Sequence, residues 1–262
     1  MFMIKRERYL KQIMPFIDKP VIKVITGIRR CGKSTFLKLI YAFLIEKGIE
    51  PNRILLINKD SLQFDSLRNY LQLAEYVNTY FKNVSGNKYL FVDEVQEIDG
   101  WEKALSGFLT DNTADLYITG SNSRMLSSEL ATYISGRYIE IKMFTLTFSE
   151  FLKFRNISEP EKIETEFGLF MKQGGFPGIH HMENDDEVIE QYVSSIYDTI
   201  LLKDVVGRNG LRDVALLERI SRFTASNCGN ITSSKKISDF LKSQKIKGSV
   251  DTVQNYLSML SS

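Results

Sequence analysis

Cysteine is scarce in this chain of 262 residues, and long runs of apolar side chains are absent. The two cysteines, Cys31 and Cys228, match neither a disulfide framework nor a metal-ligand spacing. No apolar stretch approaches the roughly 20 residues that a membrane-spanning helix needs, and charges interrupt the N-terminal residues before a signal-peptide core can form. We therefore expect a cytoplasmic protein without a membrane partner.

An excess of charge of one sign is missing as well. The 34 basic and 32 acidic side chains leave a net charge of +2, which creates no global attraction to nucleic acid or to a membrane surface. With 43% hydrophobic and 25% charged residues, the composition is that of an ordinary soluble globular protein. The length suits one large domain with one or two small ones.

The chain does contain, up to about residue 148, an alternation of apolar runs with amphipathic stretches. The apolar runs predict strands at residues 21–26, 53–58, 89–95, 116–120 and 138–145. The amphipathic stretches predict helices at residues 8–17, 33–46, 67–81, 101–109 and 127–134. Strands that alternate with helices indicate an α/β fold with a parallel sheet covered on both faces, which we assign to residues 1–148.

The pattern changes after Phe148. Helical patterns follow at residues 149–154, 161–172 and 186–203, with no convincing strand between them. We interpret residues 149–225 as a helical lid that the segment Gly174–Gly178 interrupts. In residues 226–262, two amphipathic stretches flank Gly248 and resemble a helix-turn-helix, as in an incomplete winged helix.

The segment between the first strand and the next helix has the pattern of a phosphate-binding loop. We expect nucleotide contacts from Gly27, Ile28, Arg29, Arg30, Cys31, Gly32, Lys33, Ser34 and Thr35. Gly27 and Gly32 allow backbone angles at which the loop amides point toward phosphates, at the positive end of the helix. Lys33 is placed to reach the outer phosphates of ATP, and the Ser34 hydroxyl is placed to ligate Mg²⁺. The alternative is an ordinary glycine turn, and the strand–loop–helix context argues against it.

Two acids follow the third apolar run. In a parallel sheet the strand ends on one edge face the ligand crevice, so Asp93 is expected near the metal, which it holds through water. Glu94 is expected to polarise the attacking water as general base. An acidic pair after a strand is more often a solvated turn, but the phosphate loop upstream favours the functional interpretation. Gln96 lies nearby and could equally be a surface residue.

A polar segment follows the fourth apolar run. Ser121 and Asn122 are candidates for a side chain that orients the attacking water, and we assign this catalytic role to Asn122. The alternative is a plain turn, because glycine, serine and asparagine dominate turns.

Three arginines have several interpretations. Arg137 precedes the fifth strand and should lie on the sheet edge away from the phosphate loop, so it could act as an arginine finger for a neighbouring subunit. A solvated or ion-paired arginine is an equal alternative. Arg29 and Arg30 could brace the loop, contact phosphate or pair with acids elsewhere.

Several spaced motifs together resemble the bacterial and archaeal AAA-superfamily ATPases called AAA family fourteen, which are relatives of the STAND ATPases. The motifs are Thr26–Thr35, Phe91–Gln96, Ile118–Asn122, Ser135–Arg137, Thr147–Phe151 and Gly174–Pro177. The resemblance covers about residues 1–205 and implies ATP rather than GTP, a sheet in the order 5-1-4-3-2, and a helical lid. It also implies a winged helix and a nuclease-like C-terminal domain, and we expect this chain to stop before the latter.

The last stretch is mildly basic. Residues 231–262 contain five lysines and two aspartates, a local net charge of +3. A basic helix-turn-helix can bind DNA through its phosphates. We favour a packing module with solvated lysines, because aromatic interleaving is absent and residues 250–260 contain no lysine or arginine to contact base edges. The partners to consider are ATP and ADP, a second copy of the chain, and DNA or protein at these helices.

Two functions fit these residues. The first is an Mg²⁺-dependent ATPase whose turnover moves the lid and the C-terminal helices. The second is a slow nucleotide-gated switch, or a DNA-associated binding module with little turnover. Both need the same nucleotide site, so the motifs do not separate them.

Overall fold

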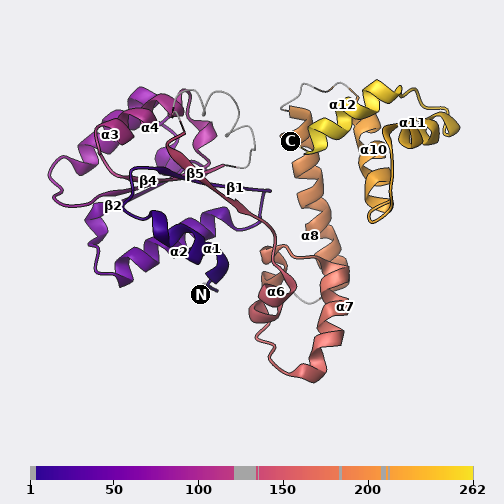
Figure 1. Ribbon diagram of the computed structural model, residues 1–262, viewed down its shortest axis with the longest axis horizontal. Helices are drawn as coiled ribbons and strands as arrows, with labels where there is room; N and C mark the ends of the chain where they lie inside the picture. The colour runs from indigo at the N-terminus through magenta and orange to yellow at the C-terminus, as the bar shows by residue number, and fades with distance from the viewer. Residues whose placement is uncertain are drawn as a thin grey trace. The chain divides into compact units, whose positions relative to one another are not determined.

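The computed structural model of the chain describes residues 4–120, 134, 136–182, 185–207, 211 and 213–261. The chain folds into two compact units, Met1–Tyr192 and Val193–Ser262. The first contains the sheet, its covering helices and the lid helices, and the second is helical (Figure 1). The domain limits that the sequence suggests within residues 149–262 stay a prediction.

The sheet has five parallel strands. They are β1 (Ile22–Gly27), β2 (Ile54–Asn58), β3 (Tyr89–Asp93), β4 (Asp115–Gly120) and β5 (Tyr138–Met143). Their order is β2-β3-β4-β1-β5, which confirms the expected α/β fold and the order 5-1-4-3-2. Because this order puts β1 and β3 inside the sheet, the loops that follow them lie near its middle and away from the edge strands.

Helices cover both faces of the sheet. They are α1 (Glu7–Ile13), α2 (Lys33–Glu46), α3 (Tyr70–Phe81) and α4 (Trp101–Thr110). Figure 1 shows α3 and α4 on one face and α1 and α2 on the other. Consecutive strand residues point to opposite faces, so Val24 joins the core on the α3 and α4 side, while Ile25 joins the core on the α1 and α2 side. Burial on both faces explains why β3 reads as an unbroken apolar run, whereas the edge strand β5 alternates and exposes Glu140 and Lys142.

Two helices differ from the sequence expectation for local reasons. The helix predicted from residue 67 begins at Tyr70, because Asn69 caps it in a reciprocal arrangement with Gln72. The helix predicted to reach residue 17 ends at Ile13, since Pro15 removes a backbone donor and a short 3-10 turn follows. The helix expected at residues 127–134 lies, apart from Ile134, outside the described residues.

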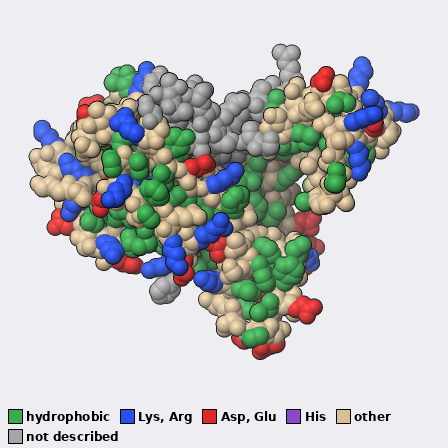
Figure 2. Space-filling model, in the orientation of Figure 1, with side chains coloured by type: hydrophobic (Ala, Val, Ile, Leu, Met, Phe, Trp, Pro, Cys, Tyr) green, Lys and Arg blue, Asp and Glu red, His purple; other side chains and the backbone are tan. Residues whose placement is uncertain are grey.

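The lid region of the first unit is helical, as expected. It contains α6 (Phe148–Phe154), α7 (Ile163–Gln173), a 3-10 turn (Pro177–His181) and the start of α8 (Asp186–Thr199). Ring contacts connect its elements, around the fully buried Phe151, and they involve Phe148, Phe151, Phe154, Phe167, Phe170 and His180. Figure 2 shows apolar side chains gathered over α6 and α7. The Leu146 N–H donates to the Gly175 carbonyl at 2.6 Å, which ties the lid to the chain leaving β5.

The second unit is a small helical cluster. It contains a π-helical segment (Ile200–Val206), α10 (Val214–Ser226), α11 (Ser234–Ser243) and α12 (Val250–Ser261). Leu217, Ile220, Ile237, Leu241 and Val253 are fully buried at its centre. The sequence predicted α11 and α12 but missed α10. Among the described residues, no helix of either unit is long and apolar enough to cross a membrane.

Candidate nucleotide site

The loop between β1 and α2 is tightly folded around two glycines. Gly27 has φ of +149°, and a Cβ there would lie 2.3 Å from the Met143 carbonyl oxygen and 2.9 Å from the Cys31 sulfur. Gly32 has φ of +105° and caps the N-terminus of α2. Only glycine fits the first position, and both angles favour glycine. The loop therefore approaches the end of β5 closely while it carries the chain to a helix N-terminus, where backbone amides attract anions.

Lys33, the first residue of α2, is buried under this loop. Its ammonium group donates to the carbonyl oxygens of Gly27 at 3.0 Å and Ile28 at 3.4 Å. The same Nζ lies 3.9 Å from Oε1 of Glu94. The ammonium group therefore lies between the loop and an acid at the end of β3, and it is held by backbone carbonyls that a phosphate group could replace.

The end of β3 meets the end of β4 at a buried threonine. The Thr119 hydroxyl donates to Asp93 Oδ1 and accepts the backbone N–H of Glu94 at 3.0 Å. Because β3 and β4 are parallel neighbours, their carboxyl ends lie at the same edge. Thr119 is fully buried, and its hydroxyl contacts the side chain of Asp93 and the backbone N–H of Glu94.

Glu94 stops β3 two residues before the expected end at residue 95. Its φ of +53° and ψ of +52° are left-handed, which ends the strand and starts the 3-10 turn Val95–Glu97. Within this turn Gln96 donates a side-chain N–H to Glu94 Oε2. Both carboxylate oxygens of Glu94 thus lie near a donor, Lys33 on one side and Gln96 on the other.

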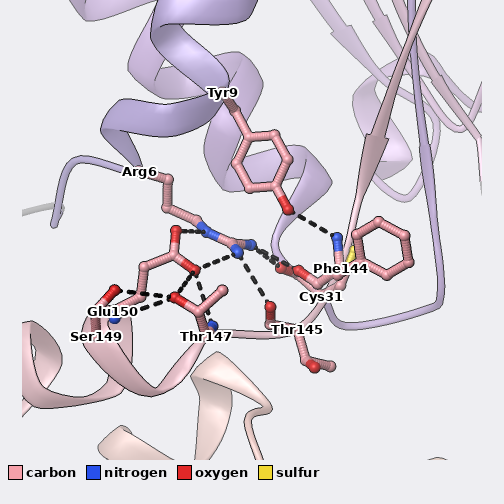
Figure 3. Close-up of polar contacts among 8 residues, drawn as sticks. All are labelled: Arg6, Tyr9, Cys31, Phe144, Thr145, Thr147, Ser149 and Glu150. Carbon is pink, nitrogen blue, oxygen red and sulfur yellow. Dashed lines mark hydrogen bonds and ion pairs between the residues drawn. The ribbon is translucent and has the colours of Figure 1, made fainter.

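A pair of residues far apart in sequence connects the loop to the lid (Figure 3). The guanidinium group of Arg6 donates to Glu150 Oε1 at 3.0 Å and to Oε2 at 2.9 Å. It also donates to the backbone carbonyls of Cys31 at 3.1 Å, Phe144 at 2.9 Å and Thr145 at 3.1 Å. Arg6 is 4% exposed. One side chain therefore links the loop, the end of β5 and the first turn of α6.

Glu150 is part of the cap of α6. Its backbone N–H donates to the Thr147 hydroxyl, and its carboxylate accepts the Thr147 N–H at 3.0 Å. Burial by itself would raise the pKa of Glu150, but the hydrogen bonds from Arg6 and Thr147 outweigh it and hold the pKa below its usual range. The carboxylate is therefore ionised at neutral pH and remains a partner for the guanidinium group.

A pocket of about 300 Å³ adjoins the loop. It is lined by Ile4, Arg6, Gly32, Thr35, Phe36, Lys38, Leu39, Phe154, Pro177, His180 and His181. His180 Nε2 is buried and, among the described residues, has no hydrogen-bond partner. Burial, with the charges of Arg155 and His181, lowers the pKa of His180 to about 4, so the ring is neutral at pH 7. A larger hollow, of about 620 Å³, lies at the opposite end of the strands and contains no residue of the loop.

The match to a family model follows this geometry. Residues 19–152, about half of the chain, match a family described as an AAA domain. The chain belongs to this AAA family. The matched residues span the sheet, the loop and the start of the lid, and the match confirms the resemblance that the spaced motifs suggest. Residues 164–262 match a second family, described as a domain of unknown function.

The curated relatives of this AAA protein are uncharacterized. One from Haemophilus influenzae is 35% identical over 259 residues, which are 98% of this chain and 64% of the relative. One from Methanocaldococcus jannaschii is 32% identical over 252 residues, which are 92% of this chain and 54% of the relative. The chain thus spans between about half and two thirds of the length of these relatives.

Two solved structures give weak overall matches. The ORC1 protein of Aeropyrum pernix in complex with DNA has a TM-score of 0.44 at 13% identity, over 98% of this chain and 82% of that one. AMPPCP-bound DnaA from Aquifex aeolicus has a TM-score of 0.45 at 14% identity, over 99% of this chain and 89% of that one. Scores this low support no inference about ligands or partners of the AAA protein.

The AAA domain brings some predicted residues together and leaves others apart. Lys33, Asp93 and Glu94 meet at one edge of the sheet, and Ser34 and Thr35 continue the first turn of α2. Arg137 is exposed, and its carbonyl accepts the Ile22 N–H at 3.0 Å, which places it at the opposite edge. Ser121 and Asn122 lie outside the described residues.

The other loop residues of the AAA domain take different positions. Arg30 has a left-handed φ of +62°, and its guanidinium lies 5.5 Å from the centre of the Tyr192 ring of α8. Arg29 is half-buried and Ile28 is exposed. Cys31 is buried, and burial raises the pKa of its thiol.

Three contributors to the site were missed from sequence. Arg6 stands in a charged N-terminal run that reads as solvated. Thr119 has a detectable signal, since it is a hydroxyl in an otherwise apolar strand next to the segment with Ser121. His180 follows the glycine-rich segment but matches no pattern, and only the fold shows that it lines the pocket.

Proposed function

We propose that this protein binds ATP with Mg²⁺ at the loop Gly27–Ser34 and hydrolyses it, and that turnover moves the lid and the C-terminal helices. The observation that carries the proposal is the approach of Lys33 to Glu94, 3.9 Å apart, beneath a loop that only glycine at position 27 can form. A cation for phosphate and an acid for water are thus present at one helix N-terminus.

The residues at this edge fit a nucleotide and a magnesium ion. Among the described residues, Lys33 contacts two loop carbonyls and a carboxylate oxygen 3.9 Å away, and phosphate oxygens could replace these partners. Asp93 is buried with one oxygen fixed by Thr119, as suits an acid that holds Mg²⁺ through water, while the Ser34 hydroxyl ligates the ion directly. Bound Mg²⁺ would offset the negative charge of the outer phosphates.

Glu94 then acts as the general base. The oxygen of a water attacks the γ-phosphorus, the bond from that phosphorus to the bridging oxygen breaks, and ADP keeps the electron pair. One proton of the water passes to the Glu94 carboxylate. Lys33 stabilises the charge on the outer phosphates. Asn122 is the proposed side chain that orients the water.

The pocket beside Thr35 is the proposed place for the nucleoside. Phosphates on the loop would leave the base and sugar next to Gly32 and Thr35, which line this pocket. Its volume of about 300 Å³ is at the lower limit for small-molecule sites. We propose ATP over GTP, and competition of GTP against a labelled ATP analogue is the test: equal affinities would contradict the preference.

The contacts of Arg6 favour a nucleotide-driven lid. Arg6 donates to the Cys31 carbonyl and to the Glu150 carboxylate at the same time. A shift of the loop when a nucleotide binds would therefore move the N-terminus of α6. The same coupling also serves the second candidate, a slow switch that reads ATP against ADP. Fast steady-state turnover without any partner would favour the ATPase over the switch.

The proposal includes partners. Arg137 is exposed on the edge away from the loop, which supports a role in the site of a second copy of the chain. In the second unit, Lys235, Lys236, Lys242, Lys245 and Lys247 are exposed on α11 and the turn after it, and Figure 2 shows basic side chains in this region. These lysines support a DNA or protein partner there.

Binding and metal dependence test the proposal. Lys33→Ala should weaken ATP binding by at least about tenfold, because it removes a charge from the outer phosphates. The matched control is Lys47→Ala, because Lys47 is exposed at the C-terminal cap of the same helix and lies outside the loop and the pocket. Chelation of Mg²⁺ with EDTA should stop turnover. Unchanged ATP affinity in Lys33→Ala would show that the loop does not hold the nucleotide.

A further inference from the structure

The hydrogen bond between Gln96 and Glu94 takes no direct part in the transfer of the water proton. Lys33 opens α2 and approaches Glu94 Oε1, whereas Gln96 belongs to the turn after β3 and donates to Oε2. Lys33 must turn toward the phosphates when a nucleotide binds. Gln96 is then the side chain that remains on the carboxylate.

The orientation of the Gln96 amide follows from its partner. An ionised carboxylate only accepts hydrogen bonds, so the NH₂ group of the amide must face Glu94 and the carbonyl must point elsewhere. That carbonyl oxygen is buried, and no residue in the described part of the chain donates to it. An unpaired buried carbonyl destabilises a fold. The side chain is therefore poorly suited to a purely structural role, and the hydrogen bond that it makes among the described residues is to the base.

The backbone around Gln96 is arranged to make this contact. Glu94 adopts the left-handed conformation, which is uncommon for residues other than glycine. The Glu94 N–H is held by Thr119 Oγ1, and the Glu94 carbonyl accepts the Glu97 N–H at 3.1 Å. The chain thus turns sharply after β3 and returns Gln96 to the carboxylate two residues earlier. The left-handed backbone at Glu94 therefore sets the positions of both its own carboxylate and the Gln96 amide.

We infer that Gln96 is a positioning residue for the hydrolysis: its amide N–H holds one carboxylate oxygen of Glu94 so that the other faces the attacking water. The inference rests on the proposed function. Gln96 neither gives nor takes a proton, since the water proton passes to Glu94 and the electron pair of the broken bond stays on ADP. Without this donor the carboxylate can rotate, and fewer encounters with water place an oxygen where the proton is released.

The variant Gln96→Met tests this role in the full chain. Methionine keeps the length of the side chain and removes both the amide donor and the unpaired carbonyl. We expect a melting temperature no lower than that of the wild type and an ATP dissociation constant within about twofold of it. The rate constant for hydrolysis should fall by about 10- to 100-fold, the usual effect of misplacing a reacting group by about 1 Å. Glu97→Met, an exposed change in the same turn, is the matched control and should turn over normally.

A double-mutant cycle separates positioning from structure. If Gln96 acts through Glu94, Gln96→Met should cause no further loss in a Glu94→Gln background, measured in single-turnover assays with radiolabelled ATP. An equal loss in both backgrounds would overturn the inference. So would a wild-type rate in Gln96→Met, or a loss that follows from lower ATP affinity or lower melting temperature. A wild type that does not hydrolyse ATP contradicts the proposed function and the inference together, whereas normal turnover in Gln96→Met contradicts only the inference.

Discussion

Arg6 and Glu150 form an ion pair through two hydrogen bonds although 144 residues separate them in the chain. The guanidinium also holds three backbone carbonyls, of which one belongs to the phosphate-binding loop. Such a group satisfies acceptors on the loop, at the end of β5 and on the first turn of α6 at once. Arg6 therefore connects the loop to the first turn of α6 through hydrogen bonds to both.

Loss of Arg6 should therefore affect stability and binding together. Arg6→Ala removes the guanidinium partner of the Glu150 carboxylate, which keeps its hydrogen bonds from Thr147, and it removes the donor to three carbonyls. We therefore expect a loss of about 3–5 kcal/mol in the free energy of unfolding. ATP binding should weaken as well. Lys5→Ala is the matched control, because Lys5 pairs with Glu46 at 3.6 Å on an exposed surface, and its loss should be below about 1 kcal/mol. Equal losses in the free energy of unfolding of the two variants, measured by urea denaturation, would show that Arg6 does not hold the loop and α6 together.

A second buried ion pair makes a different prediction. Lys23 of β1 is fully buried and pairs with Asp115 at the start of β4, at the strand ends opposite the loop. Lys23→Met should destabilise the protein by about 3–5 kcal/mol, because an unpaired charge stays buried, and Lys23→Met with Asp115→Leu should recover much of the loss. ATP affinity of the double variant should stay near wild type. A double variant that is less stable than the single one, by chemical denaturation, would contradict this account.

His180 predicts a pH dependence of stability. Its pKa falls from 6.5 to about 4 on folding, so below pH 6.5 the unfolded chain binds a proton that the folded chain does not. Stability should drop as the pH falls from 6.5 toward 4, by about 1–2 kcal/mol because the ring is only partly buried. His180→Phe should flatten this part of the stability curve. His181→Phe should flatten it less, because this change removes only the charge of an exposed neighbour and leaves the burial of His180 unchanged. Measurements should stay above pH 4.5, because the pKa of Glu150 lies below its usual range and its protonation at lower pH would add a second loss.

The role of Arg137 can be tested by mixing two inactive variants. If the arginine serves a neighbouring site, Arg137→Ala should lose about a thousandfold in turnover while it keeps ATP affinity. Activity per subunit of the wild type should rise with protein concentration. A mixture of Arg137→Ala with Lys33→Ala should recover some activity, because an intact site meets an intact arginine. If the mixture stays inactive although the variants fold and associate, Arg137 is a structural residue.

The sheet and the loop were predictable from sequence because their signals are local. Apolar runs, the spacing from Gly27 to Ser34, and the acids after the third run each lie within a few residues, and the chain direction of parallel strands brings them to one edge. Thr119 shows in the sequence only as a hydroxyl within a mostly apolar strand. Arg6 and His180 were not predictable, since their partners come from other elements and neighbouring residues give no sign of them. The left-handed Glu94 is similar, because its conformation depends on a hydrogen bond from its N–H to Thr119 on the adjacent strand.

The measurement that tests the central claim most directly is hydrolysis by Glu94→Gln. The change removes the proton acceptor and keeps the shape of the side chain, so ATP affinity should stay within about twofold of the wild type. Single-turnover hydrolysis with Mg²⁺ should fall by at least about 100-fold, the lower range of general-base contributions. A Glu94→Gln protein that binds ATP and hydrolyses it at the wild-type rate would contradict the assignment of Glu94 as the base.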